Sequence, residues 1–203
     1  MGNSGNNVSS KQSSQIKTIE RWLEDVVIGL NLCPFAAKPY NNQQVRIHVF
    51  DGDTENGLLE ELQSELTIID QELVNDGSAD KPTTDVETTL IVIPNMLHDF
   101  AAYNQFLDLV DALLDEFSWT GQYQIASFHP QYCFAGAEAE SPENLTNRSP
   151  YPLLHIIREA SIETSLQHYP DPENIPIRNI QKMNALSLEE KRRLFPYLKS
   201  HTS

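Results

Sequence analysis

The sequence predicts an α/β protein, in which a small sheet of three or more strands alternates with amphipathic helices in a single layered domain. Apolar residues recur at spacings of three and four in several long segments, a pattern typical of amphipathic helices. Short runs rich in β-branched residues separate these segments. Because the two patterns alternate along the chain instead of being grouped, they favour a layered α/β architecture.

The length and composition fit one domain with a short tail. A chain of 203 residues with 39% hydrophobic residues can bury a core of ordinary size without disulfides or metals. Residues 1–14 are polar and of low complexity, so we expect them to form a disordered tail. We therefore place the single domain at residues 15–203.

The first half of the chain begins with a helix. Its apolar pattern starts at Ile16, with Ser13 or Ser14 as N-cap. The helix must end by Cys33, because Pro34 disfavours helical angles in the residue before it. The next elements that we expect are a strand at 45–50, a helix at 57–73, a polar loop at 74–85 and a strand at 87–94.

The second half continues the alternation as far as a long irregular segment. A strongly periodic helix at 99–117 precedes a third strand at 123–128. Residues 129–150 carry no regular pattern, and a loop of this length in a compact domain is usually functional or disordered. Near the end of the chain, Ser187 and Glu190 match a capping box and predict a terminal helix.

We expect a further helix to begin directly after the irregular segment. Ser149 is the predicted N-cap, and Pro150 takes the first helical position, where its missing N–H costs nothing. On such a helix His155, Arg158 and Glu159 form a polar stripe. The opposite, apolar stripe consists of Leu153, Ile156, Ile157 and Ala160.

The charge of the chain limits its partners. The formal net charge is −15, from 29 acidic and 14 basic residues. This field repels nucleic-acid phosphates and anionic membranes, so we expect neither as a partner. An anionic ligand must therefore be met by a local cluster of arginines. The sequence does not indicate the oligomeric state.

The cellular location is predicted from the cysteines and from the lack of targeting signals. Cys33 and Cys133 are the two cysteines, and they form no CxxC pair. No apolar stretch approaches the roughly 18 to 20 residues of a membrane span, and the amino terminus lacks the apolar core of a signal peptide. We therefore expect a cytoplasmic protein with reduced thiols rather than an oxidised pair.

The start of the helix predicted at Ser149 is a candidate anion site. Asn147 and Arg148 stand just before it, and Arg158 lies a turn or two inside. Free N–H groups and the positive end of the helix dipole attract anions, and two forked guanidiniums suit a phosphate or carboxylate. We predict that these four residues bind a small anionic molecule. The alternative is an amphipathic helix whose polar stripe faces water.

Four side chains are candidates for catalysis. His129 follows a strand, where ligands bind in open α/β sheets, and is the first candidate for general acid or base; alternatively it bonds a turn carbonyl. Cys33 is a possible nucleophile, although the carboxyl end of a helix favours the neutral thiol; alternatively it is a small buried hydrophobe. His155 and Glu159, four residues apart, suit either a base with its orienting carboxylate or a simple helix contact.

No cofactor or metal is identified by a motif. The chain has no glycine-rich phosphate loop, no GxSxG and no dinucleotide fingerprint. Cys33, His129, His155 and Glu159 are acceptable zinc ligand types, but they form no recognised pair such as HExxH or CxxC. We therefore predict no metal site.

Four stretches of the chain resemble the domain of unknown function 1415 family. They follow one another in the order "WLEDVVIGLNLCPFA", "ETTLIVIP", "QIASFHPQYCFAG" and "NLTNRSPYPLLHIIRE". The resemblance runs from about Thr18 to about Leu188. It implies that these stretches belong to one recurring arrangement, and it brings no reaction, cofactor or catalytic residue.

Three functional hypotheses follow from the residues. The first is an enzyme that acts on a small anionic metabolite through an Arg/His/Cys cluster. The second is an anion-binding or regulatory module without catalysis, and the third is a structural or protein-interaction domain. The hypotheses differ in whether Cys33, His129, Arg148 and His155 converge on one open pocket.

Overall fold

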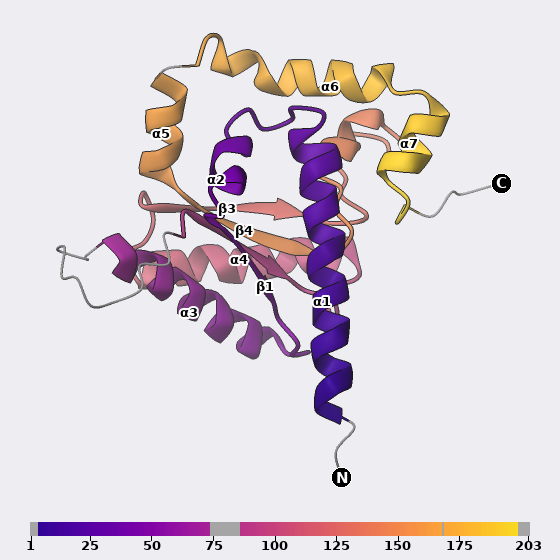
Figure 1. Ribbon diagram of the computed structural model, residues 1–203. Coiled ribbons are helices and arrows are strands. Elements are labelled where there is room, and N and C mark those ends of the chain that lie inside the picture. The colour runs from indigo at the N-terminus through magenta and orange to yellow at the C-terminus, as the bar shows by residue number, and fades with distance from the viewer. Residues whose placement is uncertain (1–3, 74–85, 168, 199–203) are drawn as a thin grey trace.

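The computed structural model describes residues 4–73, 86–167 and 169–198 and contains a four-stranded mixed sheet (Figure 1). Its strands are β1 (Val45–Val49), β2 (Thr88–Val92), β3 (Tyr123–Phe128) and β4 (Leu153–Arg158), in the order β1-β2-β4-β3. β1 pairs parallel with β2, whereas β4 pairs antiparallel with both of its neighbours. The predicted α/β class, with a small sheet of three or more strands, is therefore confirmed.

Helices of very different lengths surround this sheet. Two short 3₁₀ turns, η2 (Pro142–Thr146) and η3 (Pro172–Asn174), interrupt the long connections. A π-helical turn, η1 (Leu23–Ile28), continues the first helix. The α-helices are α1 (Ser4–Trp22), α2 (Ala37–Asn41), α3 (Glu55–Leu73), α4 (Phe100–Glu116), α5 (Glu159–Gln167), α6 (Ile175–Ala185) and α7 (Leu188–Leu194).

The two faces of the sheet carry separate cores. On one face α3 and α4 pack side by side, and their apolar stripes meet strand residues such as Ile91 and Ile156. On the other face α1 and η1 lie against Leu90 and Leu153, with α6, α7 and the chain after α7 completing the layer. Successive residues of a strand point to opposite faces of the sheet, so each helical layer packs against every second residue of the same strands.

Several predicted elements are confirmed. The helices and strands expected between residues 45 and 128 are present. α4 begins at Phe100, and the side chain of its N-cap residue Asp99 accepts a hydrogen bond from the backbone N–H of Ala102. The capping box of Ser187 and Glu190 is formed at the start of α7. The polar loop predicted at 74–85 lies outside the described residues. In the described ranges, no helix combines the length and the apolar character that crossing a bilayer requires.

The start of the first helix was predicted too late. α1 begins at Ser4, so Ser13 and Ser14 lie inside the helix and are not its N-cap. Most of the segment that we expected to be a disordered tail is therefore helical, and Lys11 Nζ donates a hydrogen bond to Asn95 Oδ1 at 3.2 Å. A polar helix without an apolar stripe gives no periodic signal, which is why the pattern appeared to begin at Ile16.

The helix predicted after Ser149 is wrong in its first part. Residues 153–158 form the strand β4, and α5 begins only at Glu159. β4 lies between two strands and is covered on both faces, so its sequence "LLHIIR" is an almost continuous apolar run. Short apolar runs of this kind do not distinguish a buried strand from a buried helix. Ser149 is buried and caps no helix; its Oγ donates to the carbonyl of Tyr151 at 2.5 Å.

Candidate functional site

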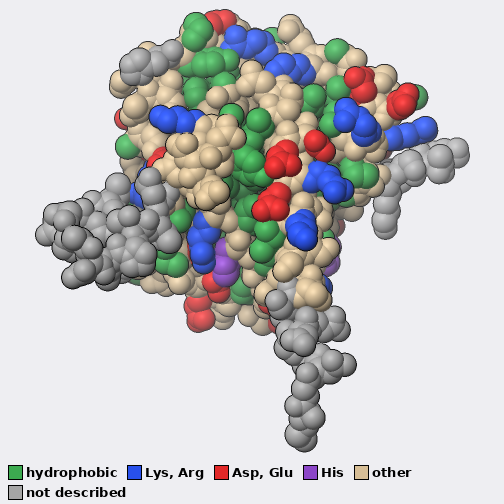
Figure 2. Space-filling model, viewed as in Figure 1, with side chains coloured by type: hydrophobic (Ala, Val, Ile, Leu, Met, Phe, Trp, Pro, Cys, Tyr) green, Lys and Arg blue, Asp and Glu red, His purple; other side chains and the backbone are tan. Residues whose placement is uncertain are grey.

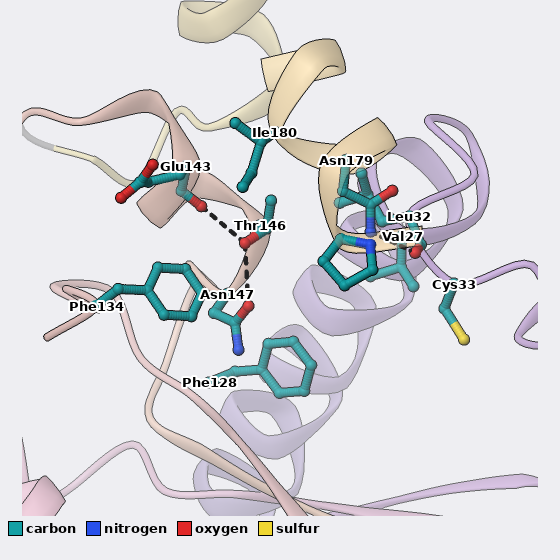
Figure 3. Close-up of a pocket in the computed structure, with 11 residues that line it drawn as sticks. Val27, Leu32, Cys33, Phe128, Phe134, Glu143, Thr146, Asn147, Asn179 and Ile180 are labelled. Carbon is teal, nitrogen blue, oxygen red and sulfur yellow. Dashed lines mark hydrogen bonds between the residues drawn. The ribbon is translucent and has the colours of Figure 1, made fainter. Parts of the chain in front are cut away.

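A cavity of about 480 Å³ lies where β3 ends, and we call it the β3 cavity (Figure 3). It is bounded by the chain around the end of η1, by the end of β3, by η2 and by α6. Its walls are mostly apolar, with a few polar side chains among them. The lining residues are Val27, Leu32, Cys33, Phe128, Phe134, Glu143, Thr146, Asn147, Pro176, Asn179 and Ile180.

The turn after η1 is held in place by α6. Asn31 adopts a left-handed conformation with φ of 50°, which ends the helical path and leaves main-chain carbonyls without helical partners. Lys182 Nζ donates to the carbonyls of Leu30 and Asn31 at 2.6 and 3.0 Å, and Asn179 Nδ2 donates to the carbonyl of Leu32 at 2.7 Å. α6 therefore satisfies this helix end and forms one wall of the cavity.

The polar side chains of the opposite wall come from η2. Thr146 Oγ1 lies 2.7 Å from the carbonyl oxygen of Glu143 and 3.1 Å from Asn147 Oδ1. Asn147 Nδ2 donates to the carbonyl of Ser127 at 3.3 Å, which ties η2 to the end of β3. Figure 3 shows the Glu143 carboxylate directed away from Cys33, so this charge lies at the rim.

Cys33 lines the cavity as a half-buried free thiol. Burial raises its pKa above the ordinary value, and hydrogen bonds from the backbone at Phe35 and Ala36 to the sulfur act in the opposite direction with smaller effect. We expected a neutral thiol because Cys33 follows a helix. The raised pKa agrees with a neutral thiol, but its main cause is burial. The sulfur is therefore protonated near neutral pH.

Of the predicted site residues, Cys33 and Asn147 line the β3 cavity, whereas His129 does not. His129 is fully buried. Its Nδ1 accepts a hydrogen bond from the backbone N–H of Gln131 at 3.0 Å, so its Nε2 carries the hydrogen and donates to the carbonyl of Leu97, also at 3.0 Å. Burial lowers the pKa of His129. Both nitrogens of the neutral ring are thus hydrogen-bonded inside the protein. This agrees with the alternative that His129 bonds a main-chain carbonyl and does not act as acid or base.

Arg148 stabilises the irregular segment 129–150. Its Nε donates to the carbonyl of Tyr132 at 3.2 Å, and its Nη2 donates to the carbonyl of Ala139 at 2.6 Å. Because no helix begins at Ser149, the free amide groups expected beside this guanidinium are missing. The geometry assigns Arg148 to internal hydrogen bonds.

Arg158 and His155 lie on opposite faces of the sheet. Arg158 is buried against α3, where its Nη2 donates to the carbonyls of Ile69 and Val86 at 2.7 and 3.3 Å. His155 faces the α1 layer, and its ring lies near Phe128, with 6.3 Å between the ring centroids. The common space expected for the two arginines and His155 is therefore not formed.

His155 is held by a hydroxyl on the neighbouring strand. Thr88 Oγ1 donates to the carbonyl of Ile156 at 2.5 Å, so it accepts from His155 Nε2, which lies 2.7 Å away. Burial lowers the pKa of His155 to about 4, so the ring is neutral near pH 7. His155 lies in β4 and Glu159 is the first residue of α5, so the two are not an i, i+4 pair on one helix face.

Sequence reasoning missed most of the cavity. Phe134 and Thr146 belong to the long irregular segment, whose length was the available signal. Asn179 and Ile180 lie in a proline-rich stretch far along the chain, where no pattern linked them to Cys33. Residues that are brought together by the packing of α6 cannot be paired from spacing alone.

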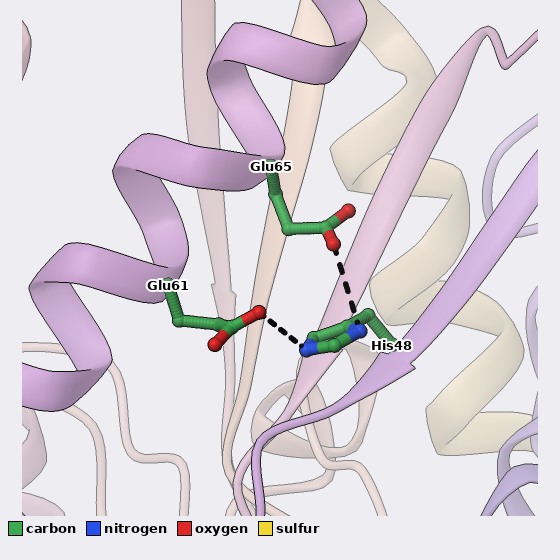
Figure 4. Close-up of side chains that lie close together, drawn as sticks. All are labelled: His48, Glu61 and Glu65. Carbon is green, nitrogen blue, oxygen red and sulfur yellow. Dashed lines mark ion pairs between the residues drawn. The ribbon is translucent and has the colours of Figure 1, made fainter.

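A second cluster of reactive side chains lies between β1 and α3 (Figure 4). His48 Nε2 lies 2.8 Å from Glu61 Oε1, and His48 Nδ1 lies 3.5 Å from Glu65 Oε1. In the described part of the chain, these three residues form a group whose donor atoms are close enough together for a metal ion. However, Arg46 binds both oxygens of the buried Glu65 at 2.8 and 3.0 Å. A cation is already present there, so the residues do not favour a metal ion.

Three of the four stretches that suggested a family resemblance meet at the β3 cavity. Its lining includes Cys33 from the first stretch, Phe128 and Phe134 from the third, and Asn147 from the fourth. No curated protein and no solved structure matches the chain. A family model does match it, over residues 14–193, close to the range expected from the resemblance. The chain therefore belongs to the family described as "Protein of unknown function (DUF1415)".

Proposed function

We propose that the protein is a small-molecule-binding module whose ligand occupies the β3 cavity and is largely apolar and either uncharged or positively charged. The observation that supports this proposal best is the convergence of four separated chain segments on one cavity. A volume of about 480 Å³ lies within the range of roughly 300 to 1,000 Å³ that is usual for ligand pockets.

The charge of the lining argues for this class of ligand. Glu143 is the acidic lining residue, and the described residues that line the cavity include no lysine or arginine. The chain as a whole has a net charge of −15, which repels anions further. The anionic metabolite that the sequence favoured is thus a poorer candidate for this cavity than a neutral or cationic molecule.

Hydrogen bonding can orient the ligand. Asn179 donates its amide hydrogen to the carbonyl of Leu32, and its Oδ1 forms no hydrogen bond with the described residues. A ligand N–H or O–H group can donate to this oxygen. The flat side chains of Phe128 and Phe134 provide apolar surface for the rest of the molecule.

Binding without catalysis fits the side chains better than an enzymatic reaction. Burial raises the pKa of Cys33, which reduces the thiolate that a nucleophile needs. His129, the expected base, is bonded on both ring nitrogens away from the cavity. An enzymatic alternative would depend on Cys33. The two free thiols support the expected cytoplasmic location.

Protection of Cys33 from alkylation tests the proposal. In the Cys133→Ser variant Cys33 is the single thiol, so iodoacetamide labelling reports on the cavity. The variant is screened with small aromatic and aliphatic molecules in neutral, cationic and anionic series. A ligand at ten times its Kd is expected to slow labelling about tenfold and to raise the Tm.

Two results would overturn the proposal. One is that no compound of any series protects Cys33; the other is that protection is confined to anions. The Cys33→Ala variant tests catalysis. A binding module keeps its affinity for the ligand in this variant, whereas an enzyme that uses the thiol no longer converts the ligand.

A further inference from the structure

A second cavity, of about 330 Å³, lies between α1 and α7, and we call it the α1–α7 cavity. Lys17 and Arg21 come from α1, four residues apart and hence on one helix face, and Arg193 comes from α7. Asp25 is the acidic lining residue. The remaining lining residues are Ser14, Thr18, Trp22, Pro150, Leu194, Pro196 and Tyr197.

This gathering of positive charge is unusual for an acidic chain. Three of the 14 basic residues line one cavity, against one acidic side chain. Figure 2 shows Lys and Arg side chains over α1 and over the neighbouring α7 region of the surface, with Asp and Glu side chains beside them. Among the residues that the structure describes, Lys17, Arg21 and Arg193 form no ion pair with a carboxylate. None of the three is held in a close ion pair with a described residue; Arg193 contributes, after the hydrogen bonds with Ser187, to the lowered pKa of Glu190.

Two aromatic side chains in the floor of the cavity are anchored by hydrogen bonds. Trp22 Nε1 and the Tyr197 hydroxyl both donate to the carbonyl of Arg148, each at 3.1 Å. With their polar atoms bonded to the main chain, the two rings present apolar surface, and Leu194 extends it. The cavity thus combines a cationic rim with an apolar floor.

We propose that the α1–α7 cavity binds a small molecule that carries a dianionic head group, a phosphate monoester or a dicarboxylate, on a small apolar or aromatic body. Three positive charges against one negative charge match a dianion. The guanidiniums of Arg21 and Arg193 can each donate two parallel hydrogen bonds to its oxygens, and Lys17 adds a point charge. The apolar body lies over Trp22 and Leu194.

This site is independent of the proposed function. Trp22 belongs to the α1–α7 cavity and Phe128 to the β3 cavity, and their rings pack edge to face with centroids 5.3 Å apart. The aromatic pair separates the two cavities. Failure of one proposal therefore leaves the other intact, since labelling of Cys33 does not report on the α1–α7 cavity.

Titration calorimetry of the full chain tests the inference with inorganic phosphate, phenyl phosphate and phenylsuccinate as probes, at fixed ionic strength. We expect saturable binding of one molecule, tighter for phenyl phosphate than for inorganic phosphate because of the apolar floor. The tighter of the two aromatic probes identifies the head group. Arg21→Gln and Arg193→Gln should each weaken binding about tenfold.

Arg192→Gln is the matched control, because Arg192 is exposed on the same short helix but does not line the cavity. It should leave the affinity within about twofold, which is the range of a screened surface charge. The inference is overturned if none of the three probes binds saturably, or if Arg192→Gln weakens binding as much as Arg193→Gln. The second result would mean that only the diffuse charge of the surface attracts anions.

Discussion

The β3 cavity and the α1–α7 cavity lie on either side of one aromatic contact, yet their linings differ in charge. The β3 cavity has amide and hydroxyl groups among apolar side chains, with one carboxylate at its rim. The α1–α7 cavity has three basic side chains around an apolar floor. One acidic chain therefore offers two chemically distinct surfaces, and each suits a ligand that the other disfavours.

The difference also shows how this protein distributes its arginines. Arg148 and Arg158 donate to main-chain carbonyls inside the fold. Arg21 and Arg193 lie on helix surfaces and remain exposed. In this chain Arg148 and Arg158 thus have internal hydrogen-bonding roles, whereas Arg21 and Arg193 line a surface cavity.

The largest expected effect comes from removing an internal arginine. Arg158→Ala leaves the carbonyls of Ile69 and Val86 without their charged donor, and it should lower the free energy of unfolding by about 3 kcal/mol. The same change at exposed Arg21 should cost less than about 0.5 kcal/mol. Urea denaturation of both variants measures the contrast. Equal stabilities would contradict the division of the arginines into internal and available groups.

Acid should lower the stability of the fold through protonation of His155. The folded-state pKa of His155 is about 4, below the ordinary value near 6.5, so the unfolded chain binds more protons between these pH values. Stability present above pH 6.5 should therefore be lost as the pH falls, by up to about 3 kcal/mol by pH 4. Thermal denaturation across this range measures the loss.

His155→Gln keeps an N–H donor for the Thr88 hydroxyl but replaces the imidazole with a side chain that does not titrate. It should flatten the dependence of stability on pH, whereas His98→Gln, at an exposed position, should not. If the wild type and His155→Gln lose stability in parallel, the buried ring is not the origin of the acid sensitivity.

A smaller effect is expected from filling one cavity. Ile180 lines the β3 cavity, and Ile177 is exposed on the same helix outside it. In the Cys133→Ser background, Ile180→Trp should slow alkylation of Cys33 several-fold because the larger ring narrows access to the thiol. Ile177→Trp should leave the rate unchanged, and phenyl phosphate should bind both variants equally. Loss of phenyl phosphate binding in Ile180→Trp would show that the two cavities are not independent.

Most of the fold could be predicted because its helices are strongly patterned. The stripe of Leu58, Leu62 and Leu66 identifies α3 from spacing alone, and it packs on the sheet as expected. The first turns of α1 were missed because they have no apolar stripe, and β4 was missed because a strand buried on both faces has no alternation. Both errors concern residues for which periodicity carries no information.

The candidate site was predicted only in part. Cys33 was found because it stands near the end of an element, where sites are commonly built, whereas Asn147 was named for a helix start that the structure does not form. His129 also stands at such an end, but its ring turns into the core, and sequence cannot give that direction. The spacing of Lys17 and Arg21 was visible, but nothing in the sequence indicates that Arg193 lies opposite them.

The edge-to-face contact of Trp22 with Phe128 gives the protein an intrinsic optical reporter. The chain has two tryptophans, and Trp119 belongs to the core on the opposite face of the sheet. A Trp119→Phe variant therefore emits from one indole, which borders the α1–α7 cavity directly and touches the wall of the β3 cavity through Phe128. Quenching or a spectral shift of its fluorescence can then register either ligand without any added label.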